Sequence, residues 1–221
     1  MPCLNEEKTI KKCINEAKKF LSENRINGEI LIVDNGSTDK SLKLIKKSKV
    51  RLINCPDKGY GNALRYGINN SYGKYIIMGD SDASYDFYHL NDFIKYLEED
   101  YDLVMGNRFK GKIDKGAMPF LNRYIGNPIL SKFGKIMFPC NINDFHSGLR
   151  AFKKDKIIDL NLKSTGMEFA SEMVIECVKN KYKTIEVPIN LMNNGLNRKP
   201  HLRPFRDGLR HVKLIMKLKF K

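Results

Sequence analysis

The chain has 221 residues, of which 42% are hydrophobic and 29% are charged. This composition excludes disordered and collagen-like chains and is sufficient for one large domain. No apolar run approaches the ~18 residues that cross a bilayer, and no signal-peptide pattern is present. The five cysteines are scattered and lack a C-x-x-C pair. They indicate a reducing compartment and argue against a disulfide scaffold or a structural zinc site.

The formal net charge of +15 arises from 40 Lys and Arg against 25 Asp and Glu. Such a charge suits nucleic acid, an anionic membrane surface or phosphorylated ligands, or it reflects a Lys-rich surface alone. Residues 198–221 carry nine Lys and Arg and a single acid, Asp207, whereas acidic residues gather in 80–102. Because the sequence has no RNA-binding aromatic motif, zinc finger or basic zipper, we expect no nucleic-acid partner.

The first half of the chain alternates helices and strands. Apolar residues spaced by three and four predict an amphipathic helix over 6–24, with Asn5 as its N-cap. The segments predicted after it are a strand at 29–33, a helix over 37–47, a strand at 50–54, a helix over 59–70, a strand at 74–78, a helix over 90–98 and a strand at 103–105. This alternation predicts an α/β domain with a mainly parallel sheet.

The second half is less regular. It contains a predicted helix over 121–137, an extended segment at 145–152, a helix over 167–179 and a strand at 184–189. Residues 204–221 combine an apolar stripe with a basic stripe, which predicts a basic amphipathic helix. Such a helix suits a membrane surface, and equally a packed helix with a solvated basic face. We therefore divide the chain into a domain of residues 1–203 and a C-terminal helix of residues 204–221.

Two acidic turns follow predicted strands, one containing Asp34 and the other containing Asp80 and Asp82. Ligands of such sheets bind beyond the carboxyl ends of the strands. A D-x-D pair can hold a hard divalent cation on a diphosphate, although the same pair is common in surface turns. Asp34 suits a ribose or base contact, or a tight turn. Gly59 and Gly61 allow a close backbone approach but lack the dinucleotide fingerprint, which argues against a Rossmann dehydrogenase.

Taken in order, these motifs resemble the glycosyltransferase family 2 pattern on the GT-A fold. The segments that carry the resemblance are Pro2 to Glu7, Ile32 to Asp39, Gly59 to Ala63 and Gly79 to Asp82. Later segments are similar to the polyprenyl-phosphate branch, typified by dolichyl-phosphate mannose synthase. They are Gly106 to Arg108, Asn122 to Tyr124, Asp144 to Arg150, Gly166 to Phe169, and two stretches of the tail, Pro200 to Arg203 and Phe205 to Gly208.

The resemblance implies roles for individual residues. Pro2, Asn5, Glu6, Asp34, Gly59 and Asp80 would contact a UDP- or GDP-sugar. Asp80 and Asp82 would hold Mg²⁺ or Mn²⁺ on its diphosphate. Arg108, Arg123 and Arg150 would face the acceptor phosphate, since guanidinium groups match phosphate oxygens. Ser84 stands where mannose synthases of this branch often have a further metal-ligating Gln.

The resemblance therefore implies a metal-dependent, inverting transfer of a sugar to polyprenyl phosphate. An ionised lipid phosphate needs positioning rather than a general base. A saccharide hydroxyl would need one, and Asp144 is the candidate for that alternative. From a different class, a catalytically inactive domain that binds membranes or nucleic acid would also fit the basic tail. We expect a cytoplasmic enzyme, peripheral on a membrane.

The N-terminus departs from the family pattern. Relatives have an apolar strand directly before the Pro-x-x-Asn-Glu motif, and here only Met1 precedes Pro2. That strand would be central, so its loss would expose ladder groups and core surface at a cost of several kcal/mol. We therefore expect that the first strand is missing and that the chain is a fragment or starts too late.

Overall fold

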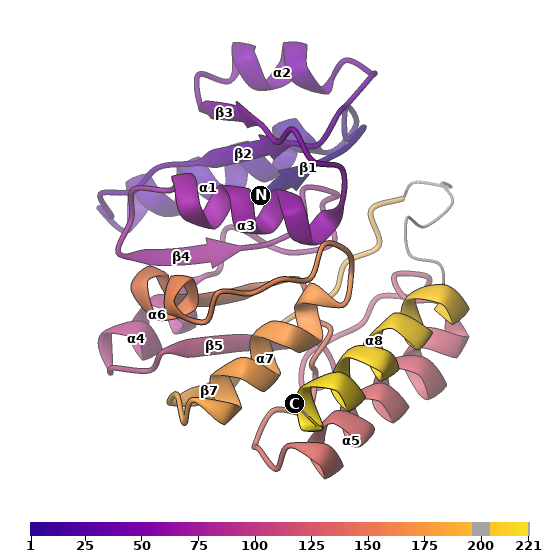
Figure 1. Cartoon of the computed structure of the whole chain (residues 1–221). Helices are drawn as coiled ribbons and strands as arrows, with labels where there is room; N and C mark the ends of the chain where they lie inside the picture. Colours follow the sequence, from indigo (N-terminus) through magenta and orange to yellow (C-terminus); the bar gives the residue numbers. More distant parts are fainter. Residues whose placement is uncertain (196–203, 221) are drawn as a thin grey trace.

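The computed structural model describes residues 1–195 and 204–220. Strands cross the middle of the molecule and helices cover both faces of the sheet (Figure 1). The strands are β1 (Pro2–Cys3), β2 (Leu31–Asp34), β3 (Arg51–Asn54), β4 (Tyr75–Met78), β5 (Leu103–Asn107), β6 (Arg150–Lys153) and β7 (Thr184–Pro188). The helices are α1 (Ile10–Glu23), α2 (Ser41–Lys47), α3 (Tyr60–Asn70), α4 (Asn91–Glu98), η1 (Asn122–Gly126), α5 (Asn127–Met137), α6 (Lys154–Asp159), α7 (Phe169–Lys179) and α8 (Pro204–Lys219).

The strands form two hydrogen-bonded groups, β1-β2-β3 and β4-β6-β5-β7. All pairs in the first group are parallel, and so is the β5–β7 pair. β6 runs antiparallel to both β4 and β5. The predicted α/β class with a mainly parallel sheet is therefore confirmed, with β6 as the exception.

The strand nearest the N-terminus, β1, has two residues. In β1, Pro2 pairs with Val33 and Cys3 pairs with Asp34. Met1 extends the contact, because its carbonyl accepts a hydrogen bond from Val33 N at 2.9 Å. β1 is therefore formed by the start of the Pro-x-x-Asn-Glu motif itself, and the statement about a strand before that motif stays a prediction.

Two local predictions differ from the structure. The first helix begins at Ile10 rather than residue 6, and Asn5 is not its N-cap. The Asn5 side-chain oxygen instead accepts a hydrogen bond from Thr38 N at 2.8 Å, which ties the chain after β1 to the turn after β2. The predicted helix over 121–137 is divided into the π-helical turn η1 and α5. Pro128 explains the change, because it has no N–H and its ring would clash with a carbonyl in the preceding α-helical turn.

Helix α8 packs on its own domain. His211 and Ile215 are buried against α5 and α7, and Arg210 forms an ion pair with Glu168 at 3.0 Å. Leu209 and Met216 on the same helix are exposed. None of the helices in the described ranges is long and apolar enough to cross a membrane. The motif from Pro200 to Arg203 lies outside the described residues.

Candidate functional site

The residues predicted to bind a nucleotide gather at one edge of the sheet, where β1, β2 and β4 end. Asn5 follows β1, Asp34 is the last residue of β2, and Asp80 follows β4. The Ser81 hydroxyl donates a hydrogen bond to the Pro2 carbonyl at 2.7 Å, which joins the acidic turn after β4 to β1. The fold therefore brings together motifs that are up to about 80 residues apart in the sequence.

The Asp34 carboxylate holds the turn that follows β2. It accepts hydrogen bonds from Gly36 N at 2.9 Å and Ser37 N at 3.1 Å. Asp34 is nearly buried, at 4% exposure. The interpretation as a turn residue is thus correct for this carboxylate, and its contact with a ribose or base stays a prediction. Glu6 is also buried, and its carboxylate accepts a hydrogen bond from the Thr9 hydroxyl at 2.8 Å.

The glycines at the start of α3 are needed for packing within the chain. Gly59 has φ +135°, and a Cβ atom there would lie 2.4 Å from the Thr165 carbonyl oxygen. A Cβ at Gly61 would lie equally close to the Ser164 oxygen, and Gly61 N donates to Thr165 O at 3.0 Å. The close approach that these glycines predict is therefore to residues 164–165. A nucleotide contact of Gly59 stays a prediction.

The acidic turn after β4 is supported from two sides. The Tyr60 hydroxyl donates to one Asp80 oxygen at 2.8 Å. A Cβ at Gly148 would lie 2.3 Å from the other Asp80 oxygen, so only glycine fits there. Burial and then the charge of Asp82 raise the pKa of Asp80 to about 6. Asp82 accepts a hydrogen bond from Ser84 N at 2.9 Å. Asp80 is thus held beside a like charge in a poorly solvated position.

This donor set fits a hard divalent cation. Carboxylate oxygens are the preferred ligands of Mg²⁺ and Mn²⁺, and these ions keep several sites for water and phosphate oxygens. A cation would also relieve the repulsion that raises the pKa of Asp80. No group of three or more acidic, His or Cys residues able to hold a metal is found in residues 1–195 and 204–220. Two carboxylates that leave coordination sites open match the way Mg²⁺ is bound together with substrate phosphates.

Arg108 and Asp144 bind each other in the interior. Arg108 Nε and Nη2 donate to the two Asp144 oxygens, each at 2.7 Å, and Arg108 N donates at 3.1 Å. Asp144 is fully buried and Arg108 is 8% exposed. In this geometry the Asp144 carboxylate accepts the two parallel hydrogen bonds that the Arg108 guanidinium can donate. The predicted phosphate contact of Arg108 and the predicted base role of Asp144 would each require this pair to open.

The other two arginines differ in burial. Arg150 is fully buried and donates to the backbone carbonyls of Phe145, Ser147 and Ala170. It therefore connects the segment before β6 to α7. Arg123 is partly exposed on η1, with its guanidinium 5.3 Å from the Tyr124 ring centre. Of the three predicted phosphate-facing arginines, Arg123 is the one with access to solvent.

A cavity of about 130 Å³ lies beside the acidic turn. Asp80 and Tyr60 contribute to one side, and Arg150 also lines it. Asn122 and Asn127 come from η1 and α5, while α8 adds several residues, among them His211. Figure 1 shows α5 and α8 next to each other at the end of the molecule opposite β3. The C-terminal helix thus forms part of the wall of a cavity that reaches Asp80.

A pair of histidines, the buried His211 and the half-buried His146, joins α8 to this wall. The Ser171 hydroxyl lies 2.8 Å from His211 Nδ1 and 3.3 Å from His146 Nε2. The two rings meet edge to face, 4.7 Å apart. Burial lowers the pKa of His211 to about 4, and burial with the neighbouring His211 lowers the pKa of His146 well below its usual range. Both side chains are therefore neutral at pH 7.

Sequence reasoning gave no role to Tyr60 or to this histidine pair. Tyr60 lies between Gly59 and Gly61 in a motif that was identified. Nothing in that motif indicates that the hydroxyl reaches Asp80, which is 20 residues away. His146 and His211 come from different elements, and their spacing carries no signal.

Comparison with known proteins identifies the family to which the chain belongs. The sequence pattern described as "Glycosyl transferase family 2" matches residues 1–160. The hexosyltransferase Agl6 of low-salt glycan biosynthesis in Haloferax volcanii is 37% identical over 98% of this chain, and the chain spans about half (52%) of its length. A dolichyl-phosphate hexose transferase of the same organism is 28% identical over 99% of this chain and 91% of its own.

Two further similarities are informative. A UDP-N-acetylglucosamine–dolichyl-phosphate N-acetylglucosaminyltransferase of Methanococcus voltae is 28% identical over 86% of this chain and 82% of its own. Among solved structures, glucosyl-3-phosphoglycerate synthase from Mycobacterium tuberculosis, in complex with Mn²⁺ and UDP-glucose, superposes with a TM-score of 0.74. It is 19% identical and the match covers 99% of this chain and 76% of that one. This likeness establishes the shared fold.

The buried Arg108–Asp144 pair predicts a large loss of stability for Asp144→Asn. The substitution keeps the shape of the side chain but leaves a buried guanidinium without a countercharge, which typically costs about 3–5 kcal/mol. Urea unfolding followed by circular dichroism measures the loss. Asp114→Asn is the control, because Asp114 is 38% exposed and pairs with Lys112 at 3.4 Å. Equal stability of the two variants would contradict a structural role for the pair.

Because His211 is neutral in the folded chain, we expect the free energy of unfolding to fall at acidic pH. Its pKa is about 4 in the folded chain and about 6.5 in the unfolded chain, so the unfolded state binds more protons between these values. The contribution of His211 to the free energy of unfolding is fully present above pH 6.5. It decreases by up to about 3 kcal/mol as the pH falls to 4. His211→Asn should reduce this pH dependence in urea unfolding measured at pH 7 and 4.5. His89→Asn, at a 71% exposed side chain, should leave it unchanged.

Proposed function

Because the chain belongs to glycosyl transferase family 2, we propose that it transfers a sugar from a UDP- or GDP-sugar to a polyprenyl phosphate. The reaction would depend on Mg²⁺ or Mn²⁺ and invert the anomeric carbon. The observation that carries the proposal is the acidic pair Asp80 and Asp82 at the end of β4, with an adjoining cavity that reaches Asp80.

Four residues at one edge of the sheet support the proposed binding site for the nucleotide-sugar donor. Asn5, Glu6, Asp34 and Asp80 lie where β1, β2 and β4 end, which is where ligands of such sheets bind. Asp80 and Asp82 would hold the divalent cation, which when bound would offset the charge that develops on the leaving nucleoside diphosphate. Tyr60 and Gly148 fix the position of Asp80 before any ligand arrives.

The acceptor half of the proposal rests on chemistry and on the relatives. A lipid monophosphate has a second pKa near 6, so it is largely ionised at neutral pH and can attack the anomeric carbon without a base. The buried ion pair of Asp144 with Arg108 favours this acceptor over a saccharide hydroxyl, for which Asp144 would have to accept a proton. We assign the phosphate contact to Arg123 on η1, because its side chain is partly exposed whereas Arg108 and Arg150 are buried. Two similar proteins are named for dolichyl-phosphate transfer.

A lipid acceptor requires the protein to reach a membrane, and η1 with α5 offers a suitable surface. Apolar residues gather on the exposed side of this segment and the turn before it: Phe120, Leu121, Tyr124, Ile125, Ile129 and Ile136, each 46–70% exposed. Lys132 lies on the same side and is also exposed. Asn122, Gly126, Asn127 and Leu130 on the same segment line the cavity beside Asp80. An anionic membrane bound there would hold its lipid phosphates next to the site.

The metal-dependent donor site predicts that Asp82→Asn weakens nucleotide binding only when metal is present. Titration calorimetry with UDP- and GDP-sugars should show an affinity loss of at least about tenfold in Mn²⁺ and little change without it. Asp86→Asn is the control, since Asp86 follows in the same loop and pairs with His89. Radiolabel transfer into organic-extractable lipid tests the acceptor. Full Mn²⁺-dependent affinity in Asp82→Asn would contradict the proposed donor site.

The apolar surface of η1 and α5 predicts that Ile125→Gln with Ile129→Gln reduces binding to anionic vesicles by about tenfold or more, because two exposed isoleucines would be lost from the lipid contact. Vesicle sedimentation at low and high salt measures this, and binding should weaken as salt rises. Ile158→Gln on α6, at 42% exposure, is the matched control. The same effect from Ile158→Gln would exclude η1 and α5 as the membrane face.

A further inference from the structure

Helix α8 presents two polar side chains to the cavity beside Asp80. Asp207 and His211 lie one turn apart on this helix, and both line the cavity. They are 5% and 4% exposed. Residues four apart on a helix have their Cβ atoms about 5–6 Å from each other. Two polar groups at this separation can contact the same hydroxyl group of a ligand.

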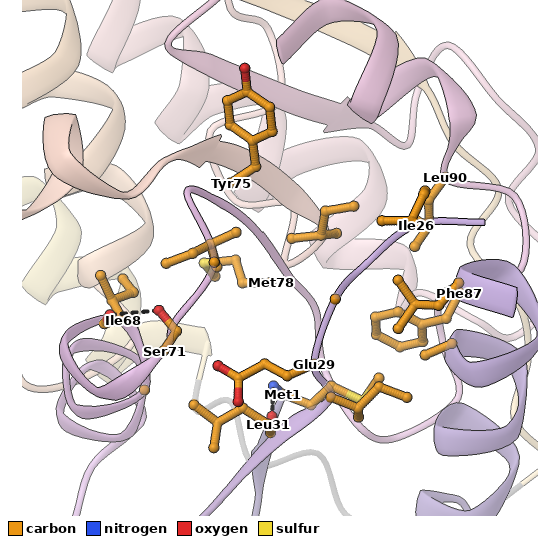
Figure 2. Close-up of a pocket in the computed structure, with 18 of the residues that line it drawn as sticks. Met1, Ile26, Glu29, Leu31, Ile68, Ser71, Tyr75, Met78, Phe87 and Leu90 are labelled. Atoms are coloured by element: carbon orange, nitrogen blue, oxygen red, sulfur yellow. Dashed lines mark hydrogen bonds between the residues drawn. The ribbon is translucent and has the colours of Figure 1, made fainter. Parts of the chain in front are cut away.

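Two cavities share Met78, the last residue of β4, but they differ in their lining. The cavity beside Asp80 measures about 130 Å³, roughly ten times the ~10–15 Å³ that one water molecule needs. The other measures about 330 Å³, and the side chains labelled around it in Figure 2 are mostly apolar. Among the residues that the structure describes, Asp80 lines the first cavity and does not line the second. A group attached to a diphosphate at Asp80 would therefore extend into the cavity that α8 closes.

The position of the proton on His211 depends on its neighbours. Ser171 has one hydroxyl proton and contacts two imidazoles, His211 Nδ1 at 2.8 Å and His146 Nε2 at 3.3 Å. Ser171 must therefore donate a hydrogen bond to one ring and accept one from the other. On its far side, His146 Nδ1 lies 3.5 Å from the Ser131 hydroxyl, whose oxygen accepts a hydrogen bond from Phe145 N at 3.3 Å.

One arrangement of protons satisfies every group in this series of contacts. Ser131 accepts from Phe145 N and donates to His146 Nδ1. His146 then donates from Nε2 to Ser171, which donates to His211 Nδ1. In the reverse arrangement the buried Ser131 hydroxyl would have no acceptor within the described part of the chain, which is unfavourable for a buried donor. The proton of the neutral His211 ring is therefore on Nε2.

The Nε2 atom of His211 is open to the cavity. No acceptor for it is present in the part of the chain that the structure describes. The buried side-chain atoms that lack a partner there are Arg65 Nε and Glu168 Oε2. Since His211 Nε2 is not one of them and the residue itself is nearly buried, the atom is accessible from the cavity that His211 lines. It offers a ligand one neutral hydrogen-bond donor.

The groups around the cavity favour an uncharged sugar. Asp80 and Asp207 would repel an acidic ligand, and the guanidinium of Arg150 already donates to three backbone carbonyls. Asp207 can accept a hydrogen bond and His211 can donate one, and a sugar hydroxyl does both at once. Phe169 also lines the cavity, and its ring offers an apolar contact to the C–H groups of a sugar.

We propose that the cavity beside Asp80 binds the transferred sugar as a neutral pyranose, and that Asp207 and His211 select this sugar through one hydroxyl. The hydroxyl would donate a hydrogen bond to Asp207 and accept one from His211 Nε2. The inference rests on the proposed function, because the sugar reaches the cavity as part of a nucleotide bound at Asp80. It assigns the choice of sugar to α8, which lies outside the residues 1–160 that match the family pattern.

Titration calorimetry in Mn²⁺ tests the selection by comparing nucleotide-sugars with their diphosphates. The probes are UDP-glucose, UDP-N-acetylglucosamine, UDP-glucuronate and GDP-mannose, with UDP and GDP as references. The nucleotide-sugar that binds most tightly should be a neutral one. His211→Asn keeps a polar group near Ser171 but loses Nε2, so it should weaken binding of that probe by about tenfold or more. It should leave binding of the matching diphosphate within about twofold. His89→Asn, at an exposed side chain, is the control and should change neither.

Two further measurements keep the test decisive if His211→Asn does not fold. Ser171→Ala leaves the cavity lining intact but allows both tautomers of His211. It should weaken binding of the same probe by about twofold, because only the fraction with the proton on Nε2 binds. In the unsubstituted chain, heteronuclear NMR of the imidazole nitrogens should place the His211 proton on Nε2.

The inference would be overturned by tightest binding of UDP-glucuronate or by a His211 proton on Nδ1. It would also be overturned if His211→Asn changed the affinities for nucleotide-sugar and diphosphate equally, or changed neither. In all these cases the diphosphates still bind, and the proposed donor site stands. If UDP and GDP showed no Mn²⁺-dependent binding to the unsubstituted chain, the proposed donor site itself would be contradicted, and the selection by α8 would fail with it.

Discussion

The burial of the Asp80 carboxylate beside a second carboxylate, Asp82, at the end of β4 is the constraint on which the site depends. Burial and the charge of Asp82 raise the pKa of Asp80 to about 6, so the fold carries a group that is costly to ionise. It maintains this arrangement with the Tyr60 hydroxyl, with Gly148, whose missing side chain lets Asp80 approach, and with the Ser81 contact to Pro2. A structure that holds like charges together in this way is prepared for a cation.

The second half of the chain contributes to the site through the helices η1, α5 and α8, which line the cavity beside Asp80. The segment of η1 and α5 lines the cavity beside Asp80 on one side and exposes apolar residues on the other. α8 is fixed to the same wall by His211 and by the Arg210–Glu168 ion pair. Helix α8 is therefore a structural part of the cavity. Its exposed residues, among them Leu209 and Met216, leave room for a surface contact as well.

The sequence predicted the order of strands and helices well, because apolar periodicity and the motifs at strand ends are local signals. It also predicted that Asp34 and Asp80 lie at one edge, since the carboxyl ends of parallel strands meet there. It did not predict that Arg108 and Asp144 bind each other, because their partnership depends on a contact across 36 residues. The N-cap prediction for Asn5 was wrong for the same reason, since a tertiary contact with Thr38 takes its side chain. The π-helical turn at η1 had a local signal in Pro128, whose effect on the helix before it was underestimated.

The two groups of strands and the acidic site are connected through β1 and β4. β1 is held by β2 along one edge, and on its other side the Ser81–Pro2 hydrogen bond connects it to the turn that carries Asp80 and Asp82. β4 supplies that turn from its carboxyl end. The two strands β1 and β4 therefore determine the positions of Asn5 and Asp80, which follow them in the chain. Catalytic residues must be held within about 0.5 Å of their productive positions. The packing of the strands in the sheet interior therefore determines the geometry of the proposed donor site.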